Sequence, residues 1–218
     1  MDKFTGKLGI VQRVLPRYRA PFFDLLAEQC TRGLSVFAGQ PRPNEGITSI
    51  SELQKAEYHP AENRHISSGP LYACVQEGLI EWLEATDPDA LIVEANPRYL
   101  STSGAIDWMH ARQRPVLGWG LGAPTAGLVS RLLGGQRRRF LQQLDGVIAY
   151  SQRGAEEYRS AGIPAERVFV APNAVVPAPQ GPPPERRGHL FEGRGKVIYV
   201  GRVQQRKRLD TLVEALAR

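Results

Sequence analysis

Six short, largely apolar segments alternate with segments of helical periodicity, and this alternation constrains the fold more than any other feature of the sequence. In chain order they read LGIVQRVL, LSVFAG, ALIVEAN, RPVLGWG, GVIAYS and RVFVAPN. Strands buried on both faces lack the apolar–polar alternation of a half-exposed strand. Such strands, separated by helices, predict a parallel sheet covered on both faces. We therefore expect an α/β fold with a doubly wound, mostly parallel sheet.

The pattern is least regular in the first half of the chain. From Gln40 to Ser68 the sequence is polar and poorly periodic, and it predicts one short strand at Thr48–Ile50. The stretch PLYACVQEGLIEWLEATDPD has apolar residues at helical spacing and predicts one helix of about four turns, closed by Asp87 and Pro88. Further on, PTAGLVSRLLGGQRRRFLQQLD predicts a helix that is interrupted near Gly134.

A proline-rich stretch, VPAPQGPPPERRGHLFEGRG, then breaks the rhythm. Five of the residues from Pro177 to Pro184 are proline, so the stretch is stiff, extended and unable to join a sheet. After it, VIYVGRVQQRKRLDTLVEAL predicts a buried strand, a basic turn and an amphipathic helix. We expect a first domain at 1–175, a linker at 176–195, and the first strand and helix of a second α/β domain at 196–218.

The chain is basic, with a formal net charge of +6, and its arginines gather in RLLGGQRRRF, ERRGHLFEGRGK and GRVQQRKR. Such a surface attracts nucleic acid, anionic lipid or phosphorylated small molecules, although a solvated face is the alternative for each run. The sequence contains no apolar run long enough to span a membrane and no signal peptide pattern. Its two cysteines lie outside any C-x-x-C pair. We expect a cytoplasmic protein, with peripheral contact to the inner face of the cell membrane as an open alternative.

Polar and aromatic residues follow the predicted strands, at the edge of a parallel sheet where ligands bind. They are Pro16, Arg17, Tyr18, Arg19, Asn96, Arg98, Trp119, Gly120, Ser151 and Asn173. Arginines, aromatic rings and hydroxyl or amide groups together suit a polar, anionic or sugar-like ligand. For each residue alone, a helix cap or a solvated loop position is the alternative.

The basic turn near the end of the sequence carries a stronger signal. Gly201 lets the backbone approach a ligand after a strand, Arg202 follows at once, and Lys207 lies near the start of the next helix. Helix N-termini attract anions, and arginine and lysine add positive charge suited to phosphate. We expect these three residues to bind a diphosphate, with a merely basic surface loop as the alternative.

Motifs of several other chemistries are missing from the sequence. It contains no G-x-G-x-x-G fingerprint, no P-loop and no G-x-S-x-G elbow. The four histidines are scattered without metal-ligand spacing, so we expect no metal site. With the dinucleotide fingerprint missing, we also expect no cofactor. His59 and His65 fall in the irregular stretch within possible reach of the ligand edge, and His110 falls on the back half of a predicted helix.

Several stretches, in this order, resemble the retaining GT-B glycosyltransferases of family 4. The terminal VIYVGRVQQRKRLDTLVEALA is similar to the first strand and helix of the family's donor domain, and VFVAPNAV to the segment that closes its acceptor domain. VQRVLPRYRAPFFDLLAE and EANPRYLST resemble a branch of the family that acts on surface polysaccharides or related glycans. The sequence departs from the family pattern at Arg208, where a glycine is usual, and in GWGLGAP, which lacks a histidine that many members carry.

The resemblance implies two Rossmann-like domains that face each other across a cleft. The N-terminal domain would take a glycan, lipid-linked or small-molecule acceptor, and the C-terminal domain a nucleotide-sugar donor, with transfer that retains the anomeric configuration and needs no metal. Arg202 and Lys207 would hold the donor diphosphate, and the loop of Arg17, Tyr18 and Arg19 would face both substrates. The family's acidic motif and nucleotide-base pocket would lie beyond Arg218, so we expect this chain to be a truncated part of the enzyme and inactive alone.

The resemblance leaves a second enzyme class open, because GT-B-like epimerases and phosphorylases share the fold. Phosphorylases are much larger, and epimerases usually lack the turn from Arg202 to Lys207. A basic α/β binding module is the alternative to an enzyme. The net charge and the arginines after Gly135 favour anionic lipid as its partner. Nucleic acid is disfavoured because aromatic residues make up only 8% of the chain and no base-stacking motif is present.

Overall fold

The structure of the chain is a computed structural model that describes residues 2–67, 69, 72–123, 134–172, 180–183, 185, 197–201, 203 and 205–217. The chain divides into two compact units, Met1–Pro177 and Ala178–Arg218. We refer to them as unit 1 and unit 2.

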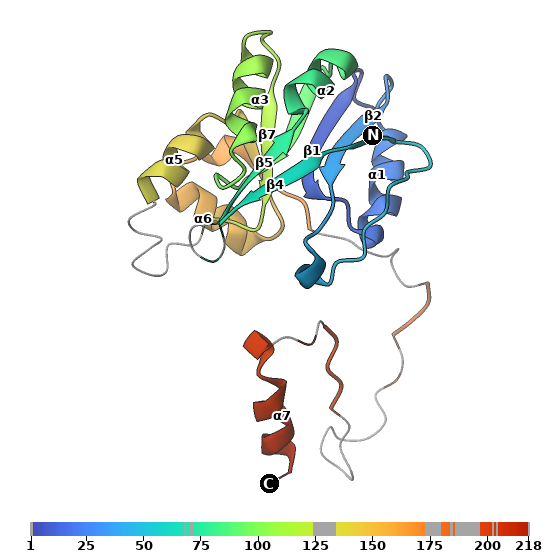
Figure 1. The fold of residues 1–218 in the computed structure, drawn as a ribbon, viewed down its shortest axis with the longest axis vertical. Helices are drawn as coiled ribbons and strands as arrows, with labels where there is room; N and C mark the ends of the chain where they lie inside the picture. Colours follow the sequence, from blue (N-terminus) through green and yellow to red (C-terminus); the bar gives the residue numbers. More distant parts are fainter. Residues whose placement is uncertain are drawn as a thin grey trace. The chain divides into compact units, whose positions relative to one another are not determined.

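Unit 1 is built on a seven-stranded sheet in the order β3-β2-β1-β6-β7-β8-β9, in which every neighbouring pair is parallel (Figure 1). The strands are β1 (Leu8–Val14), β2 (Leu34–Gly39), β3 (Glu57–Pro60), β6 (Ala90–Glu94), β7 (Val116–Gly120), β8 (Gly146–Ala149) and β9 (Val168–Val170). From β1 the chain adds strands in one direction, and from β6 it adds them in the other. The prediction of a doubly wound parallel sheet is therefore confirmed, and this is a Rossmann-like α/β fold.

Helices cover both faces of the sheet, and each face has its own hydrophobic core. On one face α1 (Ala20–Ala27) buries Phe23 in a cluster with Ile10 of β1 and Val36 of β2. On the other face Val11 of β1 joins a larger cluster with side chains from helices of the described part of unit 1. These are α2 (Leu79–Thr86), α3 (Ser101–His110), α5 (Gly134–Gln142) and α6 (Gln152–Ser160). Because neighbouring residues of a strand point to opposite faces, the apolar strands supply both cores.

The region between β2 and α2 differs from the prediction. The expected four-turn helix is wrong in its first half, because Ala73–Glu77 is strand β5, paired antiparallel with β4 (Glu62–Ile66). Gly78 follows with a left-handed φ of 77° and separates this strand from α2. The expected strand at Thr48–Ile50 is also wrong, since Ser49 makes only an isolated bridge to Pro16. Instead β3 joins the sheet beside β2.

The helix expected after β7 is described only in its second half. Residues 124–133 lie outside the described part of the chain, and α5 begins at Gly134, where an interruption was expected. α5 buries Phe140 and Leu141 against the sheet.

Unit 2 holds one α-helix among its described residues, α7 (Leu209–Leu216), preceded by a 3-10 turn at Gln205–Lys207. The strand expected before this turn is wrong: 197–200 has no regular structure, and Val200 is 90% exposed. A parallel strand needs neighbouring strands for its hydrogen bonds, and the described part of unit 2 contains none. The described residues of the proline-rich stretch, 180–183 and 185, are exposed and irregular. Within the described parts of both units, no helix is long and apolar enough to cross a membrane.

Candidate functional site

The carboxyl ends of β1 and β6 form the point where the direction of strand addition reverses. β1 and β6 are neighbours, yet the chain leaves β1 toward β2 and leaves β6 toward β7. The loops after these two strands therefore diverge, and in open α/β sheets ligands bind in the crevice that this divergence opens. A short 3-10 helix, Arg17–Arg19, follows β1 and leads directly into α1. The structure thus brings the predicted loop Pro16–Arg19 to the switch point.

Arg19 is the best-defined side chain at this point. It is only 8% exposed, and its guanidinium donates hydrogen bonds to Gln12 Oε1 (2.5 Å) and to the Tyr150 hydroxyl (2.9 Å). The guanidinium carbon lies 4.8 Å from the centre of the Trp119 ring. Arg19 Nε is buried without a hydrogen-bond partner. A buried cation whose hydrogen bonds all go to neutral groups is costly, because neutral oxygens replace its hydration only in part. This arrangement fixes the loop after β1 against β7 and β8.

An aromatic cluster surrounds this cation. Trp119, the fourth residue of β7, contacts Tyr150, with ring centroids 5.5 Å apart, and Phe22 at the same distance. Burial raises the pKa of Tyr150 and outweighs the opposing effect of Arg19, so the hydroxyl stays protonated at neutral pH while it accepts the bond from Arg19. The rings exclude water from the guanidinium, which strengthens its electrostatic interactions.

Glu94 is a functional candidate that sequence reasoning missed. It ends the otherwise apolar strand β6, and its carboxylate accepts a hydrogen bond from the backbone N–H of Arg13 at 2.7 Å. Burial raises the pKa of Glu94, and the N–H of Arg13 and the charges of Arg13 and Arg19 oppose the shift without cancelling it. The signal in the sequence was an acid at the carboxyl end of the otherwise apolar strand ALIVE, the edge at which ligands bind in open α/β sheets.

An ion-pair network borders the same edge of the sheet. Arg13 NH1 lies 2.9 Å from Glu45 Oε2, and both side chains are largely buried. Arg42 pairs with the same carboxylate at 3.2 Å. Although burial alone would raise the pKa of Glu45, the hydrogen bonds from Arg13 and Arg42 lower it below its usual value. The network ties the loop after β2 to the end of β1.

Several predicted site residues have structural roles in the fold. The Ser151 hydroxyl caps α6 by accepting from the Gly154 N–H at 3.1 Å, and Asn96 Oδ1 accepts from the Arg98 N–H at 3.2 Å within its own turn. A Cβ added at Gly120 would lie 2.6 Å from the Tyr158 hydroxyl, so packing alone accounts for a glycine there. The helix-cap alternative that the sequence left open therefore holds at Ser151, while Asn96 closes its own turn.

Other predicted site residues are exposed or fall outside the described residues. Pro16 is buried, whereas Arg17, Tyr18 and Arg98 are exposed on the switch-point loops. Gly201 and Lys207 are exposed in unit 2. Asn173 and Arg202 lie outside the described part of the chain. The diphosphate site expected at Gly201, Arg202 and Lys207 stays a prediction.

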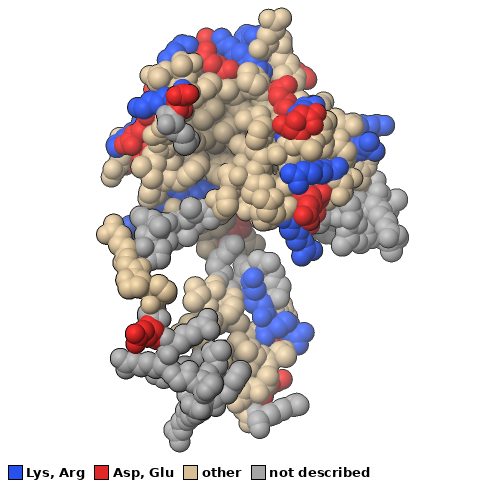
Figure 2. All heavy atoms as spheres, turned by 180° about the vertical axis from the view of Figure 1, so that it is seen from behind, with Lys and Arg blue, Asp and Glu red and all other residues tan. Residues whose placement is uncertain are grey.

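Charged side chains are interspersed on the face of unit 1 that Figure 2 shows, with acidic groups beside basic ones. A single basic stripe, typical of nucleic-acid binding, does not appear among the described residues of this face. In the described part of the chain, no group of three or more His, Cys, Asp or Glu side chains is placed to hold a metal ion.

Comparisons with solved structures return proteins of low sequence identity. A UDP-GlcNAc 2-epimerase from Neisseria meningitidis bound to UDP-GlcNAc is 18% identical, with a TM-score of 0.48 over 75% of this chain and 46% of that chain. The lipopolysaccharide outer core galactosyltransferase WaaB is 13% identical, with a TM-score of 0.48 over 78% of this chain and 46% of that one. Anabaena Alr3699/HepE in complex with UDP-glucose is 13% identical, with a TM-score of 0.47 over 77% and 44%.

This chain therefore spans less than half the length of each of these structures. A scan against protein-family models finds no match, and a search of curated proteins finds none either.

Proposed function

We propose that this chain contributes the acceptor-side half of a nucleotide-sugar-dependent glycosyltransferase. The enzyme would transfer a sugar, with retention of anomeric configuration, to a glycan, lipid-linked or small-molecule acceptor in surface glycan biosynthesis. The observation that carries the proposal is the switch point between β1 and β6, where the buried Arg19 is held by Gln12, Trp119 and Tyr150. The resemblance of the terminal basic turn to a donor-diphosphate site supports it from the sequence.

The proposed chemistry is electrostatic. When a nucleotide sugar donates its glycosyl group, negative charge grows on the leaving diphosphate, and fixed positive charge lowers the barrier to that step. Arg202 and Lys207 would supply that charge. Arg17, exposed in the 3-10 helix that follows β1, would contact polar groups of either substrate. No cofactor enters this scheme, because the nucleotide sugar is itself the substrate.

The direct test is calorimetric titration of the full-length protein, extended through a complete second domain of about 150 residues, with a panel of nucleotide sugars. The proposal predicts saturable binding of at least one donor. It fails if no common nucleotide sugar binds to a protein that is folded by circular dichroism.

Contact with anionic lipid is a second candidate, favoured by α5. This helix carries Arg137, Arg138 and Arg139 in succession, and Arg138 and Arg139 are exposed. Clustered arginines near an anionic membrane contribute about 1 kcal/mol each. Co-sedimentation with phosphatidylserine vesicles should weaken in an Arg138→Gln/Arg139→Gln variant, whereas pelleting that is unchanged, or equal with phosphatidylcholine vesicles, would remove this candidate.

A further inference from the structure

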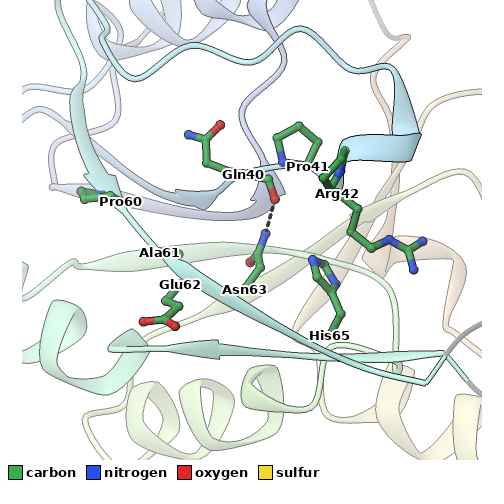
Figure 3. Close-up of a pocket in the computed structure, with 9 residues that line it drawn as sticks. Gln40, Pro41, Arg42, Pro60, Ala61, Glu62, Asn63 and His65 are labelled. Atoms are coloured by element: carbon green, nitrogen blue, oxygen red, sulfur yellow. Dashed lines mark hydrogen bonds between the residues drawn. The ribbon is translucent and has the colours of Figure 1, made fainter.

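A separate cavity of about 550 Å³ lies at the carboxyl ends of β2 and β3. Its volume falls within the range of small-molecule sites. The residues that line it come from the loop after β2, from the end of β3 and from strand β4 (Figure 3). They are Gln40, Pro41, Arg42, Pro43, Pro60, Ala61, Glu62, Asn63 and His65. Among the described residues of unit 1, the loop Pro16–Arg19 after β1 does not contribute to this lining.

Side-chain bonds fix the two walls of the cavity relative to each other. Asn63 Nδ2 donates to the backbone oxygen of Arg13 at 2.6 Å and to that of Gln40 at 3.0 Å, the bond drawn in Figure 3. A Cβ added at Gly39 would lie 2.4 Å from the Asn63 amide, so a glycine there makes room for this bridge. The bridge joins β4 to the ends of β1 and β2 and leaves the cavity preformed.

At one end of the cavity Arg42 and His65 lie side by side (Figure 3), and Tyr72 contacts both of them. The Arg42 guanidinium lies 4.8 Å from the centre of the Tyr72 ring, and His65 Nδ1 lies 3.0 Å from the Tyr72 hydroxyl. The rings of His65 and Tyr72 stack with centroids 5.8 Å apart. Among the described residues, His65 Nε2 makes no hydrogen bond, so this nitrogen is available to a ligand.

The lining is electrically balanced. Its described residues include one arginine and one glutamate, Arg42 and Glu62, so their formal charges cancel when His65 is neutral. Arg42 is already paired with Glu45, and an anionic ligand would have to compete with that carboxylate. Burial, with the charges of Arg13 and Arg42, lowers the pKa of His65, so its imidazole is neutral at pH 7. A neutral imidazole both donates and accepts hydrogen bonds.

From this geometry we infer that the cavity binds an uncharged sugar ring, as part of the acceptor in the proposed transferase. The carbon atoms of Pro41, Pro60 and Ala61 would pack against the apolar face of a pyranose. Gln40 Oε1 already accepts a hydrogen bond from the Ser49 hydroxyl at 2.6 Å, so the Gln40 amide would donate to a sugar hydroxyl through its nitrogen, and His65 would bond a hydroxyl through Nε2. A preformed, mostly apolar site with a few convergent polar groups is the usual design of a small-molecule pocket. The assignment of this sugar as an acceptor rests on the proposed function. The test of sugar binding does not depend on it.

The experiment is saturation-transfer difference NMR on the 218-residue chain with methyl glycosides that contain no nucleotide. The panel comprises the methyl glycosides of glucose, galactose, mannose and N-acetylglucosamine, with methyl glucuronide as the anionic counterpart. At least one neutral glycoside should receive saturation, and methyl glucuronide should receive less. In His65→Leu the signal should fall about fivefold, the equivalent of one lost hydrogen bond. His110→Leu is the control: His110 ends α3 and contacts Asp145, the residue before β8, so it lies near the amino end of that strand, away from the cavity. This substitution should leave the signal unchanged.

A second variant and a measurement on the wild-type protein distinguish loss of sugar binding from loss of folding. Gly39→Ala should displace the Asn63 amide and reduce the signal while circular dichroism stays native. In the wild-type protein the imidazole resonances of His65 should shift on addition of glycoside, and those of His110 should not. The inference is overturned if no neutral glycoside receives saturation, if methyl glucuronide gives the strongest signal, or if His110 shifts and His65 does not. Because the probes carry no nucleotide, failure of the donor-binding test would leave this result standing, and the reverse also holds.

Discussion

Replacing Arg19 by methionine tests the structural account of the switch point most sharply. Methionine has a similar length and keeps the packing against Trp119, but it loses both hydrogen bonds and the cation–π contact. Hydrogen bonds to a charged group contribute about 1.5–3 kcal/mol each. The cation–π contact adds about 1 kcal/mol. Removing a buried cation also removes its desolvation cost of several kcal/mol, so the terms largely offset one another.

The net change in the free energy of unfolding is decided by the Gln12 side chain, which stays buried when Arg19 is replaced. Gln12 is 1% exposed, and in Arg19→Met its amide oxygen loses its partner, which costs about 1–3 kcal/mol. We therefore expect Arg19→Met to lower the free energy of unfolding by about 2 kcal/mol. The double variant Gln12→Leu/Arg19→Met removes the orphaned oxygen too, and it should recover about 1 kcal/mol of that loss.

The assay is urea denaturation followed by circular dichroism. Arg17→Met is the matched control, because Arg17 is exposed two residues away and its replacement should change stability by less than about 0.5 kcal/mol. If Arg19→Met is as stable as the wild type, or if the double variant shows no recovery, the hydrogen bonds do not hold the loop and the reasoning is refuted.

Two further predictions concern single positions. The pKa of Glu94 is raised above its ordinary 4.5, so the folded state binds a proton more tightly than the unfolded state, and stability should fall as pH rises above about 4.5 toward the folded-state pKa. Glu94→Gln should remove this component from the pH dependence of the urea midpoint, and an unchanged profile would contradict the burial of the carboxyl. Gly120→Ala should cost about 1–3 kcal/mol by overpacking against Tyr158. A Cβ added at Gly135 of α5 would meet no atom within 4 Å, so Gly135→Ala should stabilise the protein by about 0.5–1 kcal/mol in the same denaturation experiment. If Gly120→Ala and Gly135→Ala change the free energy of unfolding equally, the packing argument is refuted.

The main sheet was predictable because its strands are buried on both faces. Continuous apolar runs such as LSVFAG and GVIAYS have one stable environment, the centre of a parallel sheet, and the helices between them leave little choice of topology. The carboxyl-edge loops follow from the same rule, so the sequence places Arg19 and Trp119 at one edge of the sheet, where the structure shows them in contact.

The elements that were mispredicted lie where burial does not decide the structure. In β5 the residues at helical spacing also fit a strand that buries Cys74 and Gln76, and the deciding residue is Gly78, whose left-handed backbone ends the strand. Val197–Val200 has strand propensity but no neighbouring strand among the described residues of unit 2. Pairing partners are set by tertiary structure, which a local pattern does not contain.

The site was harder to predict than the fold for a related reason. A polar residue at a strand end can bind a ligand, cap a helix or close a turn, and only geometry separates these roles. Ser151 and Asn96 proved to be a cap and a turn residue. The cavity beside β2 is built from prolines and amides that carry no motif, so no spacing in the sequence marks it.

The central claim is that this chain is the acceptor-side half of a retaining glycosyltransferase, and the anomeric configuration of the product tests it most directly. The full-length protein would be incubated with α-linked nucleotide sugars and with the methyl glycoside that binds best, and the product would be read from the coupling constant of its new anomeric proton. The account predicts an α-linked product from an α-linked donor, and none from the 218-residue chain alone. A β-linked product would contradict retention, and the absence of transfer from every donor tested would contradict the account itself.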